Sequence, residues 1–175
     1  MDDTDKYVTE LLDYRRRKDE HFRTPNSPLA PEERSAFSGL AYYPPNPAYR
    51  VTAALEFASE DVTVNLPTTT GDTRLMRLLG TARASTPAGE VRLTVFVPLD
   101  DATRGFIPFR DATSGAETYG AARYVDATVH GDTVLIDFNL AYHPYCAYSD
   151  RWSCPLPPRE NWLELPIRSG ERLPI

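Results

Sequence analysis

Apolar and polar residues alternate along most of the chain after residue 50, which is the pattern of half-buried β-strands. The predicted strands are 51–57, 62–66, 73–84, 90–98, 105–109 and the two runs on either side of Gly131. About seven short strands with little helix between them favour an antiparallel β-roll or barrel over a parallel α/β sheet. We therefore expect a mainly β (α+β) protein whose antiparallel core spans residues 50–142.

Before this core, apolar residues recur at the three- and four-residue spacing of helices. One helix is predicted from Asp3 to Phe22, because acidic residues lead and basic residues follow, as the helix dipole favours. A short second helix is predicted from Pro31 to Phe37, where a proline and two glutamates occupy the first turn. Residues 1–40 should thus form a helical N-terminal arm.

Two hairpins set the predicted register. A turn at Ser59-Glu60 would pair only apolar residues on one face, although this dipeptide is a mediocre turn former. Gly131-Asp132 is a better turn, because glycine at the first central position suits a type II′ turn. This second hairpin would place Val129 opposite Val134 and Ala127 opposite Ile136 on a core face.

The opposite face of the second hairpin is polar. It would place Asp126 opposite Asp137 and Tyr124 opposite Asn139. Two adjacent carboxylates repel each other unless water, a cation, an arginine or a shared proton relieves them. The face is therefore either wet, or a site for a metal ion, a small ligand or acid–base chemistry. A three-residue loop would shift the register by one and remove the pair.

Further ligand-binding candidates precede this hairpin. Arg110 can hold a carboxylate or phosphate, although residues 110–115 also suit a turn stitched by side chains. Arg123 falls on the core side, so it needs a carboxylate partner from another element. The complete set of ligand-binding candidates is Arg110, Asp111, Glu117, Tyr119, Arg123, Tyr124, Asp126, Asp137 and Asn139.

Residues 143–175 form a Cys/Pro-rich tail. Residues 154–158 cannot form a helix or a central strand, because proline lacks the amide donor, so we expect a rigid strap across the site face. The only two cysteines, Cys146 and Cys154, can be free thiols, a disulfide or metal ligands. The weak candidates for a metal site are Asp126, Asp137, His143, Cys146 and Cys154.

Composition restricts the partners. One domain is the natural expectation for 175 residues, and a net charge of −6 opposes nucleic-acid binding. No apolar run reaches the length of a membrane span, and the acidic start does not look like a secretion signal, so we expect a soluble cytoplasmic protein. The sequence leaves a homo-oligomer open, and no motif identifies a cofactor.

Several runs carry a family resemblance. They are Phe-Arg-Asp-Ala-Thr-Ser-Gly at 109–115, Glu-Thr-Tyr-Gly at 117–120, Arg-Tyr at 123–124, Asp-Phe-Asn at 137–139, Tyr-x-Pro-x-Cys-Ala-Tyr at 142–148 and Cys-Pro-Leu-Pro-Pro-x-Glu-Asn at 154–161. With these runs the chain resembles the bacterial and archaeal family catalogued as domain of unknown function 1684. The resemblance implies no established activity. His143 stands where that family's pattern reads Asn, which counts against His143 as a required base or metal ligand.

Two function classes follow. The first is a protein that binds a small molecule or a metal ion, with or without catalysis, at the Tyr124/Asp126/Asp137/Asn139 face. The second is a non-catalytic structural or protein-interaction domain, in which the same side chains bond to one another. No known catalytic motif decides whether the chain is an enzyme. What separates the classes is whether these side chains converge on an open cavity or are used up in mutual bonds.

Overall fold

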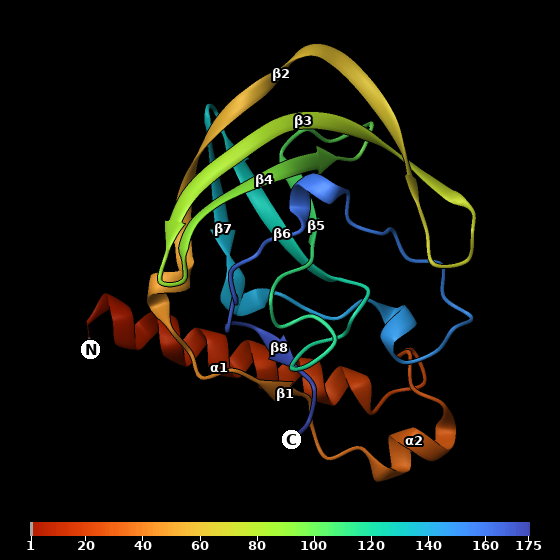
Figure 1. Cartoon of the computed structure of the whole chain (residues 1–175). Helices are drawn as coiled ribbons and strands as arrows, with labels where there is room; N and C mark the ends of the chain where they lie inside the picture. Colours follow the sequence, from red (N-terminus) through yellow and green to blue (C-terminus); the bar gives the residue numbers. More distant parts are fainter. Residues whose placement is uncertain (1) are drawn as a thin grey trace.

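Six antiparallel strands close into a barrel in the order β2-β3-β4-β5-β6-β7 (Figure 1). The structure, a computed structural model, describes residues 2–175; Met1, the first residue of the predicted N-terminal arm, lies outside them. The barrel strands are β2 (Arg50–Pro67), β3 (Thr73–Thr86), β4 (Gly89–Val97), β5 (Arg104–Phe109), β6 (Arg123–His130) and β7 (Thr133–Asp137). The predicted mainly β, antiparallel fold is confirmed.

Inside the barrel, the inward residues of each strand form one continuous apolar core. Alternation produces this core directly, since Val91, Leu93 and Val95 of β4 are buried together with Ile107 of β5 and Val125 of β6. The residues between them face away from the core. This outward face of β5 and β6 is the one that carries the candidate site.

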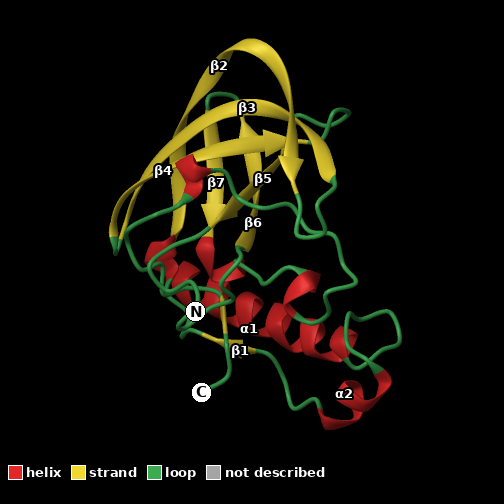
Figure 2. Cartoon of the chain, turned by 45° about the vertical axis from the view of Figure 1, so that its right-hand side comes forward, coloured by secondary structure: helices red, strands yellow, loops and turns green. Residues whose placement is uncertain are grey.

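The N-terminal arm lies beneath one end of the barrel (Figure 2). Helix α1 (Asp3–Phe22) has the predicted bounds, and the side chain of Asp2 caps it by accepting a hydrogen bond from the Asp5 amide at 2.8 Å. Helix α2 (Pro31–Ala36) is the predicted short helix. No helix within residues 2–175 combines the length and apolarity that crossing a membrane requires.

The predicted hairpin at Ser59-Glu60 is wrong. Strand β2 continues through these residues and pairs with β3 from Ala54 to Pro67, so two predicted strands are halves of one. Serine and glutamate provide no conformation for a tight reversal. The strand bends at a bulge instead, where the register shifts between Phe57 and Val62 and Gly80 lies against the β2 backbone.

The β6–β7 hairpin has the predicted two-residue loop. Gly131 has a φ of +59°, and Val129 pairs with Val134 and Ala127 with Ile136. The ladder ends there, because the chain leaves β7 at Asp137 and enters the 3₁₀ helix η2 (Phe138–Leu140).

The β6–β7 ladder therefore stops one pair short of Asp126 and Asp137. On their other edges, Asp126 pairs with Phe106 of β5 and Asp137 with Arg50 of β2. The prediction that Tyr124 lies opposite Asn139 is wrong, since Tyr124 bridges Tyr142 instead. The extra turn of η2 displaces the following residues along β6.

The tail returns along the barrel as an extended segment that contains two 3₁₀ helices, η3 (Tyr145–Ala147) and η4 (Arg159–Asn161), and ends in a small two-stranded sheet. The remaining elements are η1 (Pro47–Tyr49), β1 (Ala41–Tyr42) and β8 (Glu171–Arg172). Pro155 bridges Thr68 at the end of β2, and β8 pairs with β1. Asn161 anchors the tail, because its side chain bonds to the Thr94 backbone and to the Pro108 carbonyl at 2.7–2.9 Å.

Candidate functional site

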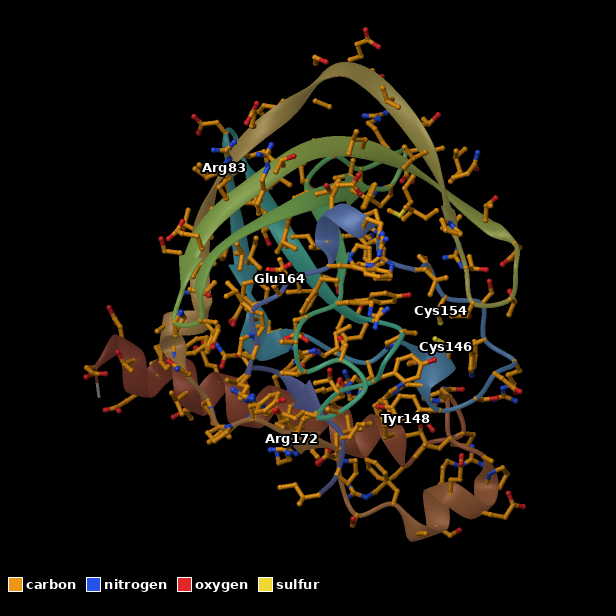
Figure 3. All side chains as sticks on the ribbon, in the orientation of Figure 1. Arg83, Cys146, Tyr148, Cys154, Glu164 and Arg172 are labelled. Carbon is orange, nitrogen blue, oxygen red and sulfur yellow. The ribbon has the colours of Figure 1, made fainter. Side chains whose placement is uncertain are left out.

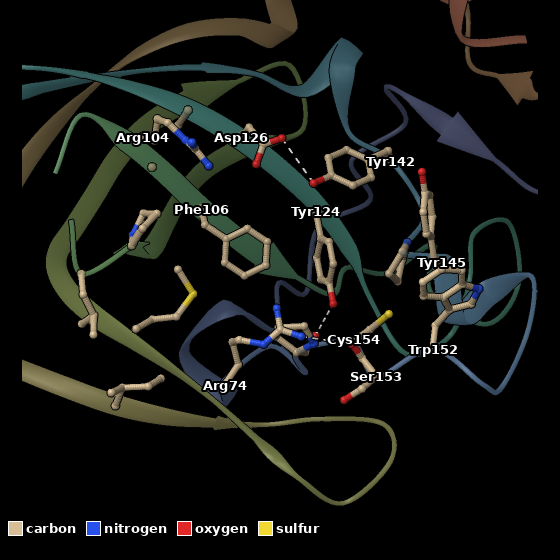
Figure 4. A pocket seen from close by; sticks show the side chains of 18 of the residues that line it. Arg74, Arg104, Phe106, Tyr124, Asp126, Tyr142, Tyr145, Trp152, Ser153 and Cys154 are labelled. Atoms are coloured by element: carbon tan, nitrogen blue, oxygen red, sulfur yellow. Dashed lines mark hydrogen bonds between the residues drawn. The ribbon is translucent and has the colours of Figure 1, made fainter. Parts of the chain in front are cut away.

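A pocket of about 980 Å³ opens on the outward face of β5 and β6 (Figure 4). The start of β3, with Arg74 and Met76, forms one wall, and the tail from Pro144 to Pro155 forms another. The floor comes from Phe106 and Tyr124, which alternate with core residues on their strands. The pocket thus lies where three segments distant in the sequence meet.

Five aromatic side chains line this pocket: Phe106, Tyr124, Tyr142, Tyr145 and Trp152. They pack edge to face, with ring centroids 4.8 Å apart for Phe106 and Tyr124, 5.7 Å for Tyr124 and Tyr142, and 5.2 Å for Tyr145 and Trp152. The Tyr124 hydroxyl donates a hydrogen bond to the Pro155 carbonyl, which ties the strap to β6. Burial raises the pKa of both Tyr124 and Tyr142, so their hydroxyls stay neutral.

Three charged side chains lie in the same pocket. Arg74 donates a hydrogen bond to the Ser153 carbonyl at 3.4 Å, while Arg104 is 77% exposed beside Asp101. Asp126 accepts a hydrogen bond from the Tyr142 hydroxyl at 3.3 Å, and burial raises the pKa of its carboxyl. The lining therefore carries two positive charges against one negative, in a chain whose net charge is −6.

The predicted carboxylate pair borders a second, smaller pocket of about 280 Å³ between α1 and the β6–β7 face. Asp126 and Asp137 both line it, together with Tyr7 and Arg50. Asp137 is already bonded, since it accepts from the Tyr7 hydroxyl at 2.8 Å and lies 3.9 Å from the Arg50 guanidinium. An arginine and a tyrosine thus relieve the charge of Asp137.

Two predicted ligand-binding residues form a buried ion pair. Arg123, on the core side of β6, meets the carboxylate of Asp111 at 3.1 Å, and both side chains are almost fully buried. Arg123 also donates to the carbonyls of Ile167, Ser169 and Glu171, so it holds the C-terminal segment against the barrel. Burial lowers the pKa of Arg123, and Asp111 opposes that change.

Most of the other predicted residues also bond within the fold. Glu117 accepts from the Tyr43 hydroxyl at 2.7 Å and from Arg168 at 2.8 Å, and these bonds, led by that of Arg168, lower its pKa to about 2. The guanidinium of Arg110 lies 4.5 Å from the centre of the Trp162 ring. Asn139 is buried and bonds to the Asn46 backbone at 2.9 Å. These contacts link loops to the barrel.

The weak metal candidates of the tail lie around Tyr119. The Nε2 atom of His143 accepts from the Tyr119 amide at 3.2 Å, and burial lowers the His143 pKa to about 3. Cys146 and Cys154 are free and lie near each other (Figure 3). Within residues 2–175, no group of three or more His, Cys, Asp and Glu side chains is placed to hold a metal ion.

Of the residues that the sequence singled out, Tyr124, Asp126 and Cys154 line this pocket, and the expected strap borders it at Pro155. The other lining residues were not predicted. They include Arg74 and Arg104, Phe106 and Trp152. One signal was available: Phe106 lies between the core residues of β5, so strand alternation turns a large aromatic ring outward. Nothing in the local pattern relates Arg74 or Trp152 to β6, because only the folded chain brings them together.

Fold and pocket together define a class: a six-stranded antiparallel barrel with an aromatic pocket on its outward face, closed by a proline-rich strap. The chain belongs to the family described as protein of unknown function (DUF1684), whose model matches residues 35–172. The resemblance seen in the sequence motifs is thereby confirmed.

A solved structure extends this comparison. The chain is 39% identical to an uncharacterized protein of Haloarcula marismortui whose solution NMR structure is known, and the two folds agree with a TM-score of 0.74. The match covers 98% of this chain and 96% of that one. The comparison with curated proteins gave no match.

Proposed function

We propose that this protein binds a small planar molecule, aromatic or conjugated, that carries an acidic group. The pocket beside β5 and β6 supports this proposal most directly, because it joins five aromatic side chains to a pair of arginines. Aromatic walls favour a flat apolar body, and guanidinium groups favour a carboxylate, phosphate or sulfonate. Its volume of about 980 Å³ is that of a typical small-molecule site.

The charge balance argues for an anionic rather than a cationic ligand in this pocket. Arg74 and Arg104 outnumber Asp126 there, although acidic residues outnumber basic ones in the whole chain. Arg104 can turn toward a ligand, since its side chain is exposed and its ion pair with Asp101 is long, at 4.0 Å. Asp126 accepts a hydrogen bond from the Tyr142 hydroxyl, and its other carboxylate oxygen can accept one from a donor group on the ligand.

Binding without covalent catalysis is the function that the pocket's chemistry favours. Burial raises the pKa of the Cys154 thiol to about 11, which is opposite to the change that activates a nucleophilic cysteine. His143 points its Nε2 atom at the Tyr119 amide, so it is not placed as a base beside that thiol.

The remaining predicted residues fit the alternative of an internal network, which we propose as their role. Asp111, Glu117, Arg123 and Asn139 each bond to groups of other segments of the chain. Such bonds hold the N-terminal arm and the tail on the barrel, and they leave the outward face of β5 and β6 free for a ligand.

Fluorescence titration with 8-anilinonaphthalene-1-sulfonate tests the proposal, because this probe is aromatic and anionic. The variants Arg74→Ala and Arg104→Ala should each weaken binding by roughly five- to tenfold, as lost charge-assisted bonds do. Arg83→Ala is the matched control, because Arg83 is an exposed arginine of β3 outside the pocket. A thermal-shift panel of aromatic carboxylates, aromatic phosphates and uncharged aromatics then identifies the acidic group.

Two results would refute the proposal. One is equal binding of the probe by wild type, both pocket variants and the control, because the probe would then bind outside this pocket. The other is stabilisation by uncharged aromatics alone, which would remove the role of the arginines.

A further inference from the structure

The two cysteines of the chain meet at the edge of the proposed pocket. Cys146 and Cys154 lie close together (Figure 3), with the backbone amide of Cys146 3.3 Å from Sγ of Cys154. Both side chains pack in one cluster with Tyr124. The intervening residues 147–153 double back to bring them together. Both thiols are free in this structure.

The backbone on either side of this contact is fixed. Cys154 exchanges hydrogen bonds with Thr69, from the Thr69 amide to its carbonyl at 3.0 Å and from its own amide to the Thr69 hydroxyl at 3.2 Å. Cys146 lies in η3, where the amides of Ala147 and Tyr148 donate to the carbonyls of Pro144 and Tyr145. The approach of the two cysteines is therefore part of the fold.

The two thiols differ in accessibility. Cys146 is half-buried, whereas Cys154 is buried at 7% exposure. Burial and the neighbouring Cys146 raise the pKa of Cys154 to about 11, so Cys154 ionises reluctantly. A soluble oxidant would thus meet Cys146 first.

We propose that Cys146 and Cys154 are a redox modification site that forms a reversible intramolecular disulfide. With a low-molecular-weight disulfide such as oxidised glutathione, the Cys146 thiolate attacks one sulfur and displaces one glutathione thiolate. Cys154 then gives up its proton and attacks the Cys146 sulfur of the mixed disulfide, which releases the second glutathione. Two protein thiols are oxidised and one glutathione disulfide is reduced to two thiols.

The bond would act on the pocket wall. Trp152 and Ser153 lie within the loop that it closes, and Tyr145 directly precedes it; all three line the pocket. Closing residues 146–154 removes freedom from this wall, so the oxidised form should bind the aromatic probe more tightly. This consequence, unlike the disulfide itself, rests on the proposed function.

Peptide mapping tests the disulfide without any ligand. Trypsin cuts after Arg123, Arg151 and Arg159, so the two cysteines fall on the separate peptides 124–151 and 152–159. After treatment of the purified full chain with oxidised glutathione, the monomer should yield these peptides joined, lighter by two hydrogens than their sum. The melting temperature should rise by roughly 5–10 °C and return on reduction.

Cys146→Ser and Cys154→Ser provide the controls, and neither should show the joined peptide or the rise in melting temperature. Full alkylation of both cysteines by iodoacetamide after oxidation would overturn the proposal. So would a linkage found only in dimers. Because the joined peptide is sought in the wild-type chain, poor folding of a variant does not change the outcome.

Probe titration of the oxidised and reduced forms separates the two proposals. Several-fold tighter binding by the oxidised form supports the effect on the pocket. Equal binding by the two forms overturns that effect, while the peptide map still decides whether the disulfide forms. If neither form binds the probe, the proposed function fails, and the joined peptide still decides the disulfide.

Discussion

Arg123 shows how far a single residue can be understood from sequence. Its position on the core side of a strand required a carboxylate from another element, and Asp111 is that carboxylate. The pairing follows from the high energy of a buried unpaired charge. Its other partners, three carbonyls of residues 167–171, could not be predicted, because backbone groups leave no mark on the sequence.

Replacing Arg123 by methionine should lower the free energy of unfolding by about 3–5 kcal/mol, because it leaves the Asp111 carboxylate buried without its partner. Urea unfolding measures the change. Arg83→Met, at an exposed position of β3, is the control and should change stability by less than about 0.5 kcal/mol. Equal values for the two variants would show that the buried pair does not stabilise the fold.

His143 makes stability depend on pH. Burial, with Arg123 and Lys18 nearby, lowers its pKa from 6.5 to about 3, so between these values the unfolded chain binds a proton that the folded chain excludes. The neutral imidazole therefore contributes its full stability above pH 6.5, and this contribution falls as the pH drops toward 3.

His143→Asn should remove this dependence. Relative to the variant, wild type should lose about 2–3 kcal/mol of unfolding free energy between pH 7 and pH 4.5, and comparison at each pH cancels the other titrating groups. Urea unfolding at both pH values checks it. If the difference in unfolding free energy between wild type and variant stays constant with pH, the folded chain does not exclude a proton from His143.

At the scale of elements, the predictions succeeded where a local signal and the tertiary pairing agree. Apolar spacing and charge order predicted α1 from Asp3 to Phe22, and Gly131 predicted the β6–β7 turn. They failed at Ser59-Glu60, where β3 pairs with β2 on both sides of the assumed turn. Long-range pairing overrode local pattern there, and Gly80 is the residue that lets the two strands approach.

Gly80→Ala should therefore destabilise the protein by at least about 2 kcal/mol, because an added Cβ would collide with the Glu56 carbonyl in the neighbouring strand. Thermal or urea unfolding measures this. Gly120→Ala is the control, since a Cβ there makes only ordinary contacts, the nearest at 3.5 Å. A Gly80 variant as stable as the Gly120 variant would mean that the bulge tolerates a side chain.

At the scale of the whole molecule, the sequence predicted the class of fold and the proline-rich strap, but it did not predict the pocket. Alternation along β6 turned Tyr124 and Asp126 outward, and the prolines predicted an extended tail. The walls come from β3, β5 and the tail, and their meeting depends on barrel closure. The proposed function therefore depends on one claim, that this pocket on the outward face of β5 and β6 receives a ligand.

The chain's two tryptophans allow a direct test. Trp152 lines the pocket, whereas Trp162 lies outside it, with its indole N–H bonded to the Pro157 carbonyl at 3.2 Å. The decisive measurement is the two indole N–H resonances in a ¹H–¹⁵N NMR titration with 8-anilinonaphthalene-1-sulfonate. We predict that the Trp152 resonance shifts and saturates while that of Trp162 stays in place; a shift of Trp162 with Trp152 unmoved would contradict the claim.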